Sequence, residues 1–133
     1  MAVFLDTSAI FALLDADDSN HAAAYEGWGL LSRRSEIPLT HNYVLLEAAA
    51  LIQKRLGREA LRDFLETIVP LLSIVWIDEN LHAAAAAALL TAGDRKLSLV
   101  DCASFEVMRR TGVRTFFAFD RNFLEMGFEA IHA

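Results

Sequence analysis

The sequence predicts a single α/β domain over residues 1–133, with a parallel sheet and helices on both of its faces. Three observations lead to this fold class. The chain has 133 residues, which suits one domain with a sizeable core. Apolar residues make up 55% of it, with only 6 glycines and 2 prolines, so long regular elements are expected. Short β-rich runs alternate with helical stretches, which is typical of a parallel sheet.

The first elements of the chain already show this alternation. Residues 3–5 form a β-rich run that indicates a buried strand, and residues 7–14 favour a helix. A polar turn with several possible helix caps leads to a second helix at residues 21–33. Residues 37–39 are too short to be assigned firmly. If they form a strand, Pro38 belongs at an edge of the sheet or at the start of the strand.

The middle of the chain predicts two helices and a strand. Residues 42–54 are apolar on nearly every helical face, so this helix is expected to be deeply packed and to end at Gly57. A further amphipathic helix is expected at residues 59–72, with Pro70 marking its end. Residues 73–77 then indicate a buried strand.

Four elements are expected in the last third, namely helices at residues 78–93 and 97–112 and strands at residues 115–119 and 127–131. The two acids that open the first of these helices suit its N-terminus. Residues 115–119 are the clearest strand in the chain, and Asp120 follows them directly.

Composition and charge limit the classes of protein to which the chain can belong. Every apolar stretch is broken by charge well before the ~20 residues of a membrane span. The N-terminus lacks the basic segment of a signal peptide, and the single cysteine, Cys102, allows no internal disulfide, so we expect a cytoplasmic protein. The net charge of −6 argues against a nucleic-acid partner unless cations bound to an acidic site cancel part of it.

Two aspartates follow predicted strands. Asp6 comes directly after the first strand, and Asp120 comes directly after the clearest one. In open α/β sheets, ligands bind at the carboxyl edge where these residues would lie. For each aspartate considered alone, the simpler interpretation is a cap of the helix that follows.

Glu47 lies in the helix that is apolar on nearly every face, and Val44 and Leu51 share its own face. A carboxylate buried there would cost several kcal/mol unless it were paired or bound a cation. We therefore expect Glu47 to be buried and to bind a cation. The alternative is a glutamate that reaches solvent at the helix edge.

Asp101 has the spacing of a capping box with Ser98, in which each side chain bonds to the backbone of the other residue. That interpretation is favoured for Asp101 alone, but one of its oxygens can still point outward to a ligand. Together, the four acids predict a site for Mg²⁺ or Mn²⁺, because both ions prefer oxygen ligands. Such ions activate water and stabilise phosphoryl charge during phosphodiester cleavage, with either one or two ions bound.

The pattern resembles the PIN-domain nucleases, and among them the VapC-type toxins of bacterial toxin–antitoxin pairs. The resemblance covers almost the whole chain and rests on four segments in order: residues 4–9, Glu47, residues 97–104 and residues 117–123. No single motif is specific, but all four in this order are. The part from residue 94 to residue 128 looks especially like VapC-type toxins.

The resemblance implies a three-layer α/β/α sandwich around a mostly parallel central sheet, and an endoribonuclease that depends on Mg²⁺ or Mn²⁺. It assigns the metal site and catalysis to four acids: Asp6, Glu47, Asp101 and Asp120. Members of the family commonly carry a hydroxyl residue beside the first aspartate, and Thr7 and Ser8 fit that position and are candidates for contacts with the substrate. The resemblance also implies an RNA substrate, a cognate antitoxin protein and a homodimer.

Three basic residues are candidates for phosphate contacts because they lie close in sequence to the acids: Arg95, Lys96 and Arg121.

Cys102 has no neighbouring histidine to serve as its base, so a buried structural thiol is expected. The four histidines show no paired zinc-ligand spacing. Trp28 and Trp76 are expected in the core, with an interface as the alternative for Trp28.

Other acidic Mg²⁺-binding folds fit the sequence less well. A phosphoacceptor receiver domain needs paired acids after its first strand and a lysine after a late strand, but Asp6 stands alone and Asp120 occupies the later position. A haloacid-type phosphatase needs a second aspartate where this chain has Ser8. The remaining alternative is a non-catalytic PIN-fold binding module, which the loss of an acid would favour, and none of the four is lost.

Overall fold

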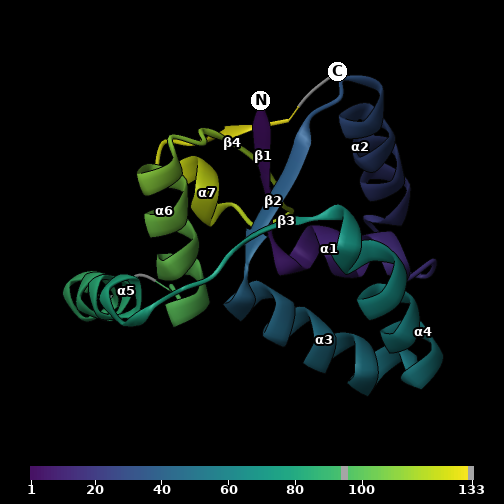
Figure 1. Ribbon diagram of the computed structural model, residues 1–133, viewed down its shortest axis with the longest axis horizontal. Helices are drawn as coiled ribbons and strands as arrows, with labels where there is room; N and C mark the ends of the chain where they lie inside the picture. The colour runs from purple at the N-terminus through teal and green to yellow at the C-terminus, as the bar shows by residue number, and fades with distance from the viewer. Residues whose placement is uncertain (94–95, 132–133) are drawn as a thin grey trace.

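Five parallel strands form one sheet in the order β3-β2-β1-β4-β5 in the computed structural model, which describes residues 1–93 and 96–131 (Figure 1). Every pair of neighbouring strands is parallel, which confirms the predicted fold class. The strands are β1 (Ala2–Leu5), β2 (Ile37–His41), β3 (Ser73–Val75), β4 (Thr115–Phe117) and β5 (Glu129–Ala130).

Helices cover both faces of the sheet, so the predicted three-layer sandwich is confirmed. Figure 1 shows α5, α6 and α7 on one side of the sheet and α1 and α2 on the other. The helices are α1 (Thr7–Leu14), α2 (His21–Arg33), α3 (Asn42–Leu56), α4 (Arg58–Asp63), α5 (Glu79–Thr91), α6 (Leu99–Thr111) and α7 (Asn122–Glu125). Within the described residues, no helix has both the length and the apolar character that crossing a membrane requires.

A cluster of phenylalanines forms the part of the core that joins β1, β4, α6 and α7. Phe4, Phe105, Phe116 and Phe123 are each at most 2% exposed. The ring of Phe123 lies 5.0 Å from that of Phe116 and 5.1 Å from that of Phe105, measured between centroids. Aromatic rings at these separations stabilise the core beyond their buried area. This packing fixes the relative positions of the elements that carry Asp6, Asp101 and Asp120.

The strand at residues 37–39 is longer than expected and lies inside the sheet, between β3 and β1. Pro38 is near its start, as one alternative predicted, but not at an edge. The missing N–H of Pro38 is tolerated because β2 pairs with β3 only from Leu39 onward. On the other side, Ile37 donates its N–H to the carbonyl of Met1 at 2.8 Å.

The helix predicted at residues 59–72 is divided into three parts. After α4, a π-helical turn spans Phe64–Ile68, and a 3₁₀ turn spans Val69–Leu71. Pro70 lies in the last turn, where it cannot donate an i→i−4 hydrogen bond and its ring crowds the preceding turn. The change of helix type therefore has a cause in the sequence.

The expectation that Trp76 lies in the core is wrong, because β3 is an edge strand that ends at Val75. The residues of β3 are exposed or half-buried, and Trp76, which follows the strand, is 70% exposed. Ile77 turns back toward the protein and donates its N–H to Asn42 Oδ1 at 2.7 Å. Trp28 is half-buried and packs against the core, as predicted.

Candidate active site

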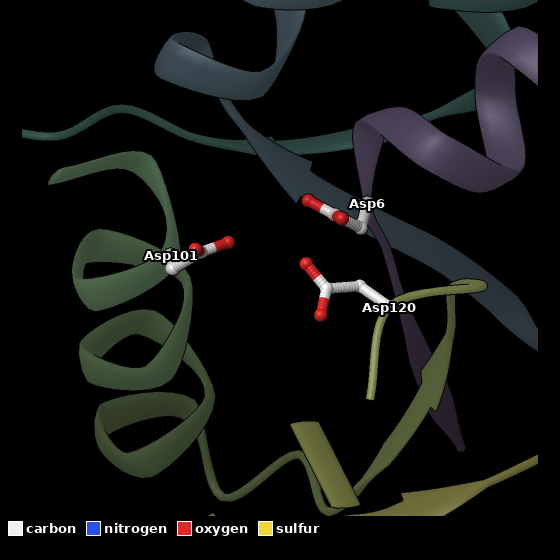
Figure 2. Close-up of side chains that lie close together, drawn as sticks. All are labelled: Asp6, Asp101 and Asp120. Carbon is white, nitrogen blue, oxygen red and sulfur yellow. The ribbon is translucent and has the colours of Figure 1, made fainter. Parts of the chain in front are cut away.

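Three aspartates from distant parts of the chain meet at the carboxyl edge of the sheet. Asp6 follows β1, Asp101 lies in the first turn of α6, and Asp120 lies in the loop after β4. Figure 2 shows their side chains pointing toward one another. One carboxylate oxygen from each lies within 4.8 Å of the other two. Because β1 and β4 are adjacent and parallel, their carboxyl ends bring Asp6 and Asp120 together.

Asp6 is the most deeply buried of the three, at 5% exposed. Burial raises its pKa from 3.8 to about 7, and the negative charges of Asp101, Glu47 and Asp120 add to this rise. A hydrogen bond from the backbone N–H of Thr7 opposes the rise. Asp6 is also the N-cap residue of α1, but its side chain makes no cap hydrogen bond. The carboxylate is therefore not occupied by a helix-capping hydrogen bond.

Asp101 combines the two roles that its sequence position allows. Its Oδ2 accepts the backbone N–H of Ser98 at 3.0 Å, while the Ser98 hydroxyl accepts the backbone N–H of Asp101 at 3.1 Å. This capping box begins α6 and fixes the side chain. Burial raises the pKa of Asp101, with Asp120 and Glu47 contributing to the rise, while hydrogen bonds to Ser98 oppose it.

Asn122 is a site residue that the sequence analysis missed. Its backbone N–H donates to Asp120 Oδ1 at 2.8 Å, and its side-chain amide donates to Asp120 Oδ2 at 3.4 Å and to Asp101 Oδ2 at 3.5 Å. The bond between the Asn122 N–H and Asp120 two residues earlier is an Asx turn, which is a recognisable local signal. The contact with Asp101 spans 21 residues and has no local signal.

Ser8, one of the two hydroxyl residues beside Asp6, bonds to other parts of the protein. Its hydroxyl accepts the backbone N–H of Phe119 at 2.9 Å and donates to Asp6 Oδ2 at 3.5 Å. Ser8 thereby joins the loop that carries Asp120 to the carboxylate of Asp6. Thr7 is buried, whereas Ser8 is half-buried, and the Oγ1 of Thr7 has no hydrogen-bond partner among the described residues.

Glu47 is not part of this group of three, and the expectation that it is buried is wrong. Its side chain is exposed on α3, as the alternative interpretation proposed. The neighbouring Leu46 is 71% exposed, so this side of α3 is not covered by the core. Its charge nevertheless raises the pKa of both Asp6 and Asp101, which places Glu47 within electrostatic reach of them.

The predicted phosphate contacts lie at the rim of the site or outside the described part of the chain. Lys96 is exposed, and its carbonyl accepts a hydrogen bond from the side chain of Asn122 at 3.5 Å. Arg121 is exposed between Asp120 and Asn122. Arg95 lies outside the described residues.

The donor set fits a hard divalent cation. Three carboxylates converge, and neither of the two ion pairs formed within the described part of the chain involves them. Such a cluster without a counter-charge is electrostatically unfavourable, and a bound cation would remove the repulsion. Oxygen-only ligands favour Mg²⁺ or Mn²⁺ over zinc, which prefers nitrogen and sulfur. Cys102, the only thiol, is buried.

Comparisons with known proteins agree with this geometry. The PIN domain profile matches residues 3–129. The chain is 32% identical over 127 residues to the 23S rRNA-specific endonuclease VapC20 of Mycobacterium tuberculosis, and the match covers 95% of each protein. The crystal structure of VapC20, described as a sarcin-ricin loop cleaving toxin, superimposes with a TM-score of 0.85 over 99% of this chain and 100% of that one, at 30% identity.

Two more distant solved structures share the fold. PAE2754 from Pyrobaculum aerophilum has a TM-score of 0.65 at 21% identity and covers 98% of this chain and 88% of its own. FitAcB from Neisseria gonorrhoeae has a TM-score of 0.68 at 16% identity and covers 98% of this chain and 96% of its own. At these identities the likeness supports the architecture alone. With the profile and the VapC20 match, the chain belongs to the PIN domain family.

Proposed function

We propose that this protein is a metal-dependent endoribonuclease and the toxin component of a toxin–antitoxin pair. The observation that carries the proposal is the convergence of Asp6, Asp101 and Asp120, whose carboxylate oxygens lie within 4.8 Å of one another and form no ion pair with a basic residue in the described part of the chain. A non-catalytic binding module would not need three mutually repelling carboxylates at one point. The relationship to an endonuclease over 95% of the chain supports the same reaction class.

The side chains of the site have distinct roles in this proposal. Asp6, Asp101 and Asp120 would hold Mg²⁺ or Mn²⁺, and Asn122 and Ser8 keep these carboxylates in position. When bound, the ion would activate a water molecule and stabilise the charge that develops on the phosphate. Glu47, which is exposed, would act from the rim of the site. Lys96 and Arg121, which are exposed, would contact RNA phosphates, and Arg95, outside the described residues, is the third candidate for such a contact.

The substrate that we propose is 23S rRNA at its sarcin-ricin loop, because the VapC20 relative acts there. With Mg²⁺ present, the purified protein should cleave a hairpin oligonucleotide carrying that loop, and Asp120→Asn should not. A hairpin of the same composition with a scrambled loop is the matched substrate and should remain intact. Equal cleavage of both hairpins would overturn the proposed substrate, and cleavage of duplex DNA without cleavage of RNA would overturn the proposed activity.

We also propose that the protein is cytoplasmic and has two protein partners, an antitoxin and a second copy of itself. Tyr25, Leu46, Trp76 and Leu90 are each at least 70% exposed. Exposed apolar side chains indicate an interface only where they gather in one patch, which a homodimer along these residues would require. A separate groove of about 250 Å³ lies between α2 and the β4–β5 edge, with a mostly apolar lining that includes Leu30, Phe117 and Ile131. We assign the groove to an apolar segment of the antitoxin and the exposed side chains to a homodimer.

Light scattering tests both assignments. At micromolar concentration the chain alone should have the mass of a dimer. Co-expression with the cognate antitoxin should give a larger complex that purifies as one species. A monomeric mass would contradict the dimer. A complex that survives replacement of Leu30 by glutamate would contradict the assignment of the groove.

A further inference from the structure

Two polar residues at the end of β2 are completely buried. Thr40 and His41 are both 0% exposed, and they lie next to the acidic site without belonging to it. Buried polar groups destabilise a fold unless they are hydrogen-bonded. Their bonding partners therefore indicate what they do in the protein.

The hydroxyl of Thr40 donates to the carbonyl oxygen of Leu5 at 2.8 Å. Leu5 is the last residue of β1 and immediately precedes Asp6. This side-chain bond ties the end of β2 to the backbone that carries Asp6. It adds to the backbone pairing of the two strands, whose register ends at Phe4 and Leu39.

The hydrogen bonds of His41 define which ring nitrogen carries the proton. Nδ1 accepts the backbone N–H of Val44 at 3.2 Å, so Nδ1 is unprotonated and His41 caps α3. Nε2 therefore carries the hydrogen and donates it to the Ser104 hydroxyl oxygen at 2.8 Å. That hydroxyl in turn donates to the carbonyl of Val100 at 2.8 Å. Every polar atom in this chain has a partner of the right kind.

The ends of this chain of bonds lie beside the acids. Val44 is in the first turn of α3, three residues before Glu47. Val100 precedes Asp101 in the first turn of α6, and Ser104 is one turn further along. The chain of bonds therefore links the helix that carries Glu47 to the helix that carries Asp101.

We infer that His41 is a positioning residue of the metal site, an inference that rests on the proposed function. Through its bond to Ser104, His41 holds α6 and Asp101 in place relative to α3. Burial lowers the pKa of His41 from 6.5 to about 4, so the ring stays neutral and keeps this tautomer near neutral pH. Removing the bond leaves each helix intact but takes away one of the contacts that hold α6 in place relative to α3. The carboxylates then have to be brought together by the cation itself, which weakens its binding.

The test compares two hydroxyl deletions in α6. Ser104→Ala removes the acceptor of His41 Nε2, whereas Thr111→Ala removes a hydroxyl that bonds only to carbonyls of its own helix, those of Val107 and Met108. Mn²⁺ affinity is measured by calorimetry, alongside thermal melting in chelator. Removing a group that hydrogen-bonds directly to a metal ligand commonly weakens metal binding by 10–100-fold. Ser104 acts one step further from the ligands, so we expect Ser104→Ala to raise the Mn²⁺ dissociation constant by up to about 10-fold, and Thr111→Ala to leave it unchanged.

His41→Asn gives an independent variant, because asparagine can still cap α3 but is too short to reach Ser104. His41→Asn should weaken Mn²⁺ binding to a similar extent. The double variant, His41→Asn with Ser104→Ala, should bind Mn²⁺ as tightly as either single variant, since all three lack the same bond. Ser104→Thr keeps the hydroxyl and should restore most of the affinity. If Ser104→Ala does not fold, His41→Asn provides the comparison.

Two outcomes separate failure of this inference from failure of the proposed function. If the wild type binds Mn²⁺ and the folded Ser104 and His41 variants bind it equally well, the two residues are only structural and the inference is overturned. If the wild type itself binds no Mn²⁺, the proposed metal site and the inference both fail.

Discussion

Asp6→Asn is expected to abolish RNA cleavage and to leave the metal-free protein at least as stable as the wild type. The amide has the shape of the carboxylate but gives up the charge that holds a cation. Loss of several kcal/mol of metal-derived stabilisation corresponds to a fall in rate of about three orders of magnitude. Cleavage of the RNA hairpin at saturating Mg²⁺ measures this loss.

The stability half of this prediction depends on pH. The pKa of Asp6 rises from 3.8 to about 7 in the folded, metal-free protein. Because the folded state binds this proton more tightly than the unfolded state, the contribution of Asp6 to stability is fully present below pH 3.8 and is lost as the pH rises through 7. Asp6→Asn has no such loss, so its advantage in unfolding free energy should grow toward pH 8, reaching on the order of 1–4 kcal/mol.

Thermal melting in chelator at pH 5 and pH 8 checks the sign. The melting temperature of Asp6→Asn, relative to that of the wild type, should be higher at pH 8 than at pH 5. A variant that melts well below the wild type at pH 8 would show that Asp6 mainly supports the fold. If Asp6→Asn cleaved the RNA hairpin at the wild-type rate, the assignment of Asp6 to the catalytic site would be wrong.

Chelation should abolish cleavage by the wild type, and added Mg²⁺ or Mn²⁺ should restore it. In the proposed site a metal ion would need the ionised Asp6 carboxylate, and protons compete for that carboxylate below its pKa of about 7. The Mg²⁺ concentration that gives half-maximal cleavage should therefore rise by up to about 10-fold for each pH unit below 7. Cleavage that persists after thorough chelation would exclude the metal mechanism. A half-maximal concentration that stays constant from pH 8 to pH 5.5 would exclude the role of Asp6 in this competition.

Local patterns were enough to predict most of the fold. The bounds predicted for the first two helices, residues 7–14 and 21–33, match α1 and α2, because a polar turn separates two apolar periodic segments. Three acids of the site were also predicted, since Asp6 and Asp120 follow strands and Asp101 has the spacing of a capping box. What brings them together is the parallel arrangement of adjacent strands, which the alternation of helices and strands already indicates.

The predictions that failed depended on contacts between distant segments. Glu47 and Trp76 were expected to be buried because their neighbours in sequence are apolar, but which side of α3 and which edge of the sheet stay uncovered is decided by tertiary packing. Asn122 and His41 were missed for a related reason. Their partners, Asp101 and Ser104, are 21 and 63 residues away, and no periodicity connects them.

The anomalous signal of Mn²⁺ in crystals soaked with that ion tests the central claim most directly. The three-aspartate site predicts a peak at the carboxyl edge of the sheet, roughly 2–2.3 Å from oxygens of Asp6, Asp101 and Asp120. Crystals of Asp120→Asn grown in the same form provide the control and should show a weaker peak or none. If wild-type crystals soaked in millimolar Mn²⁺ show no peak between these three carboxylates, the site is not the metal centre on which the proposed cleavage depends.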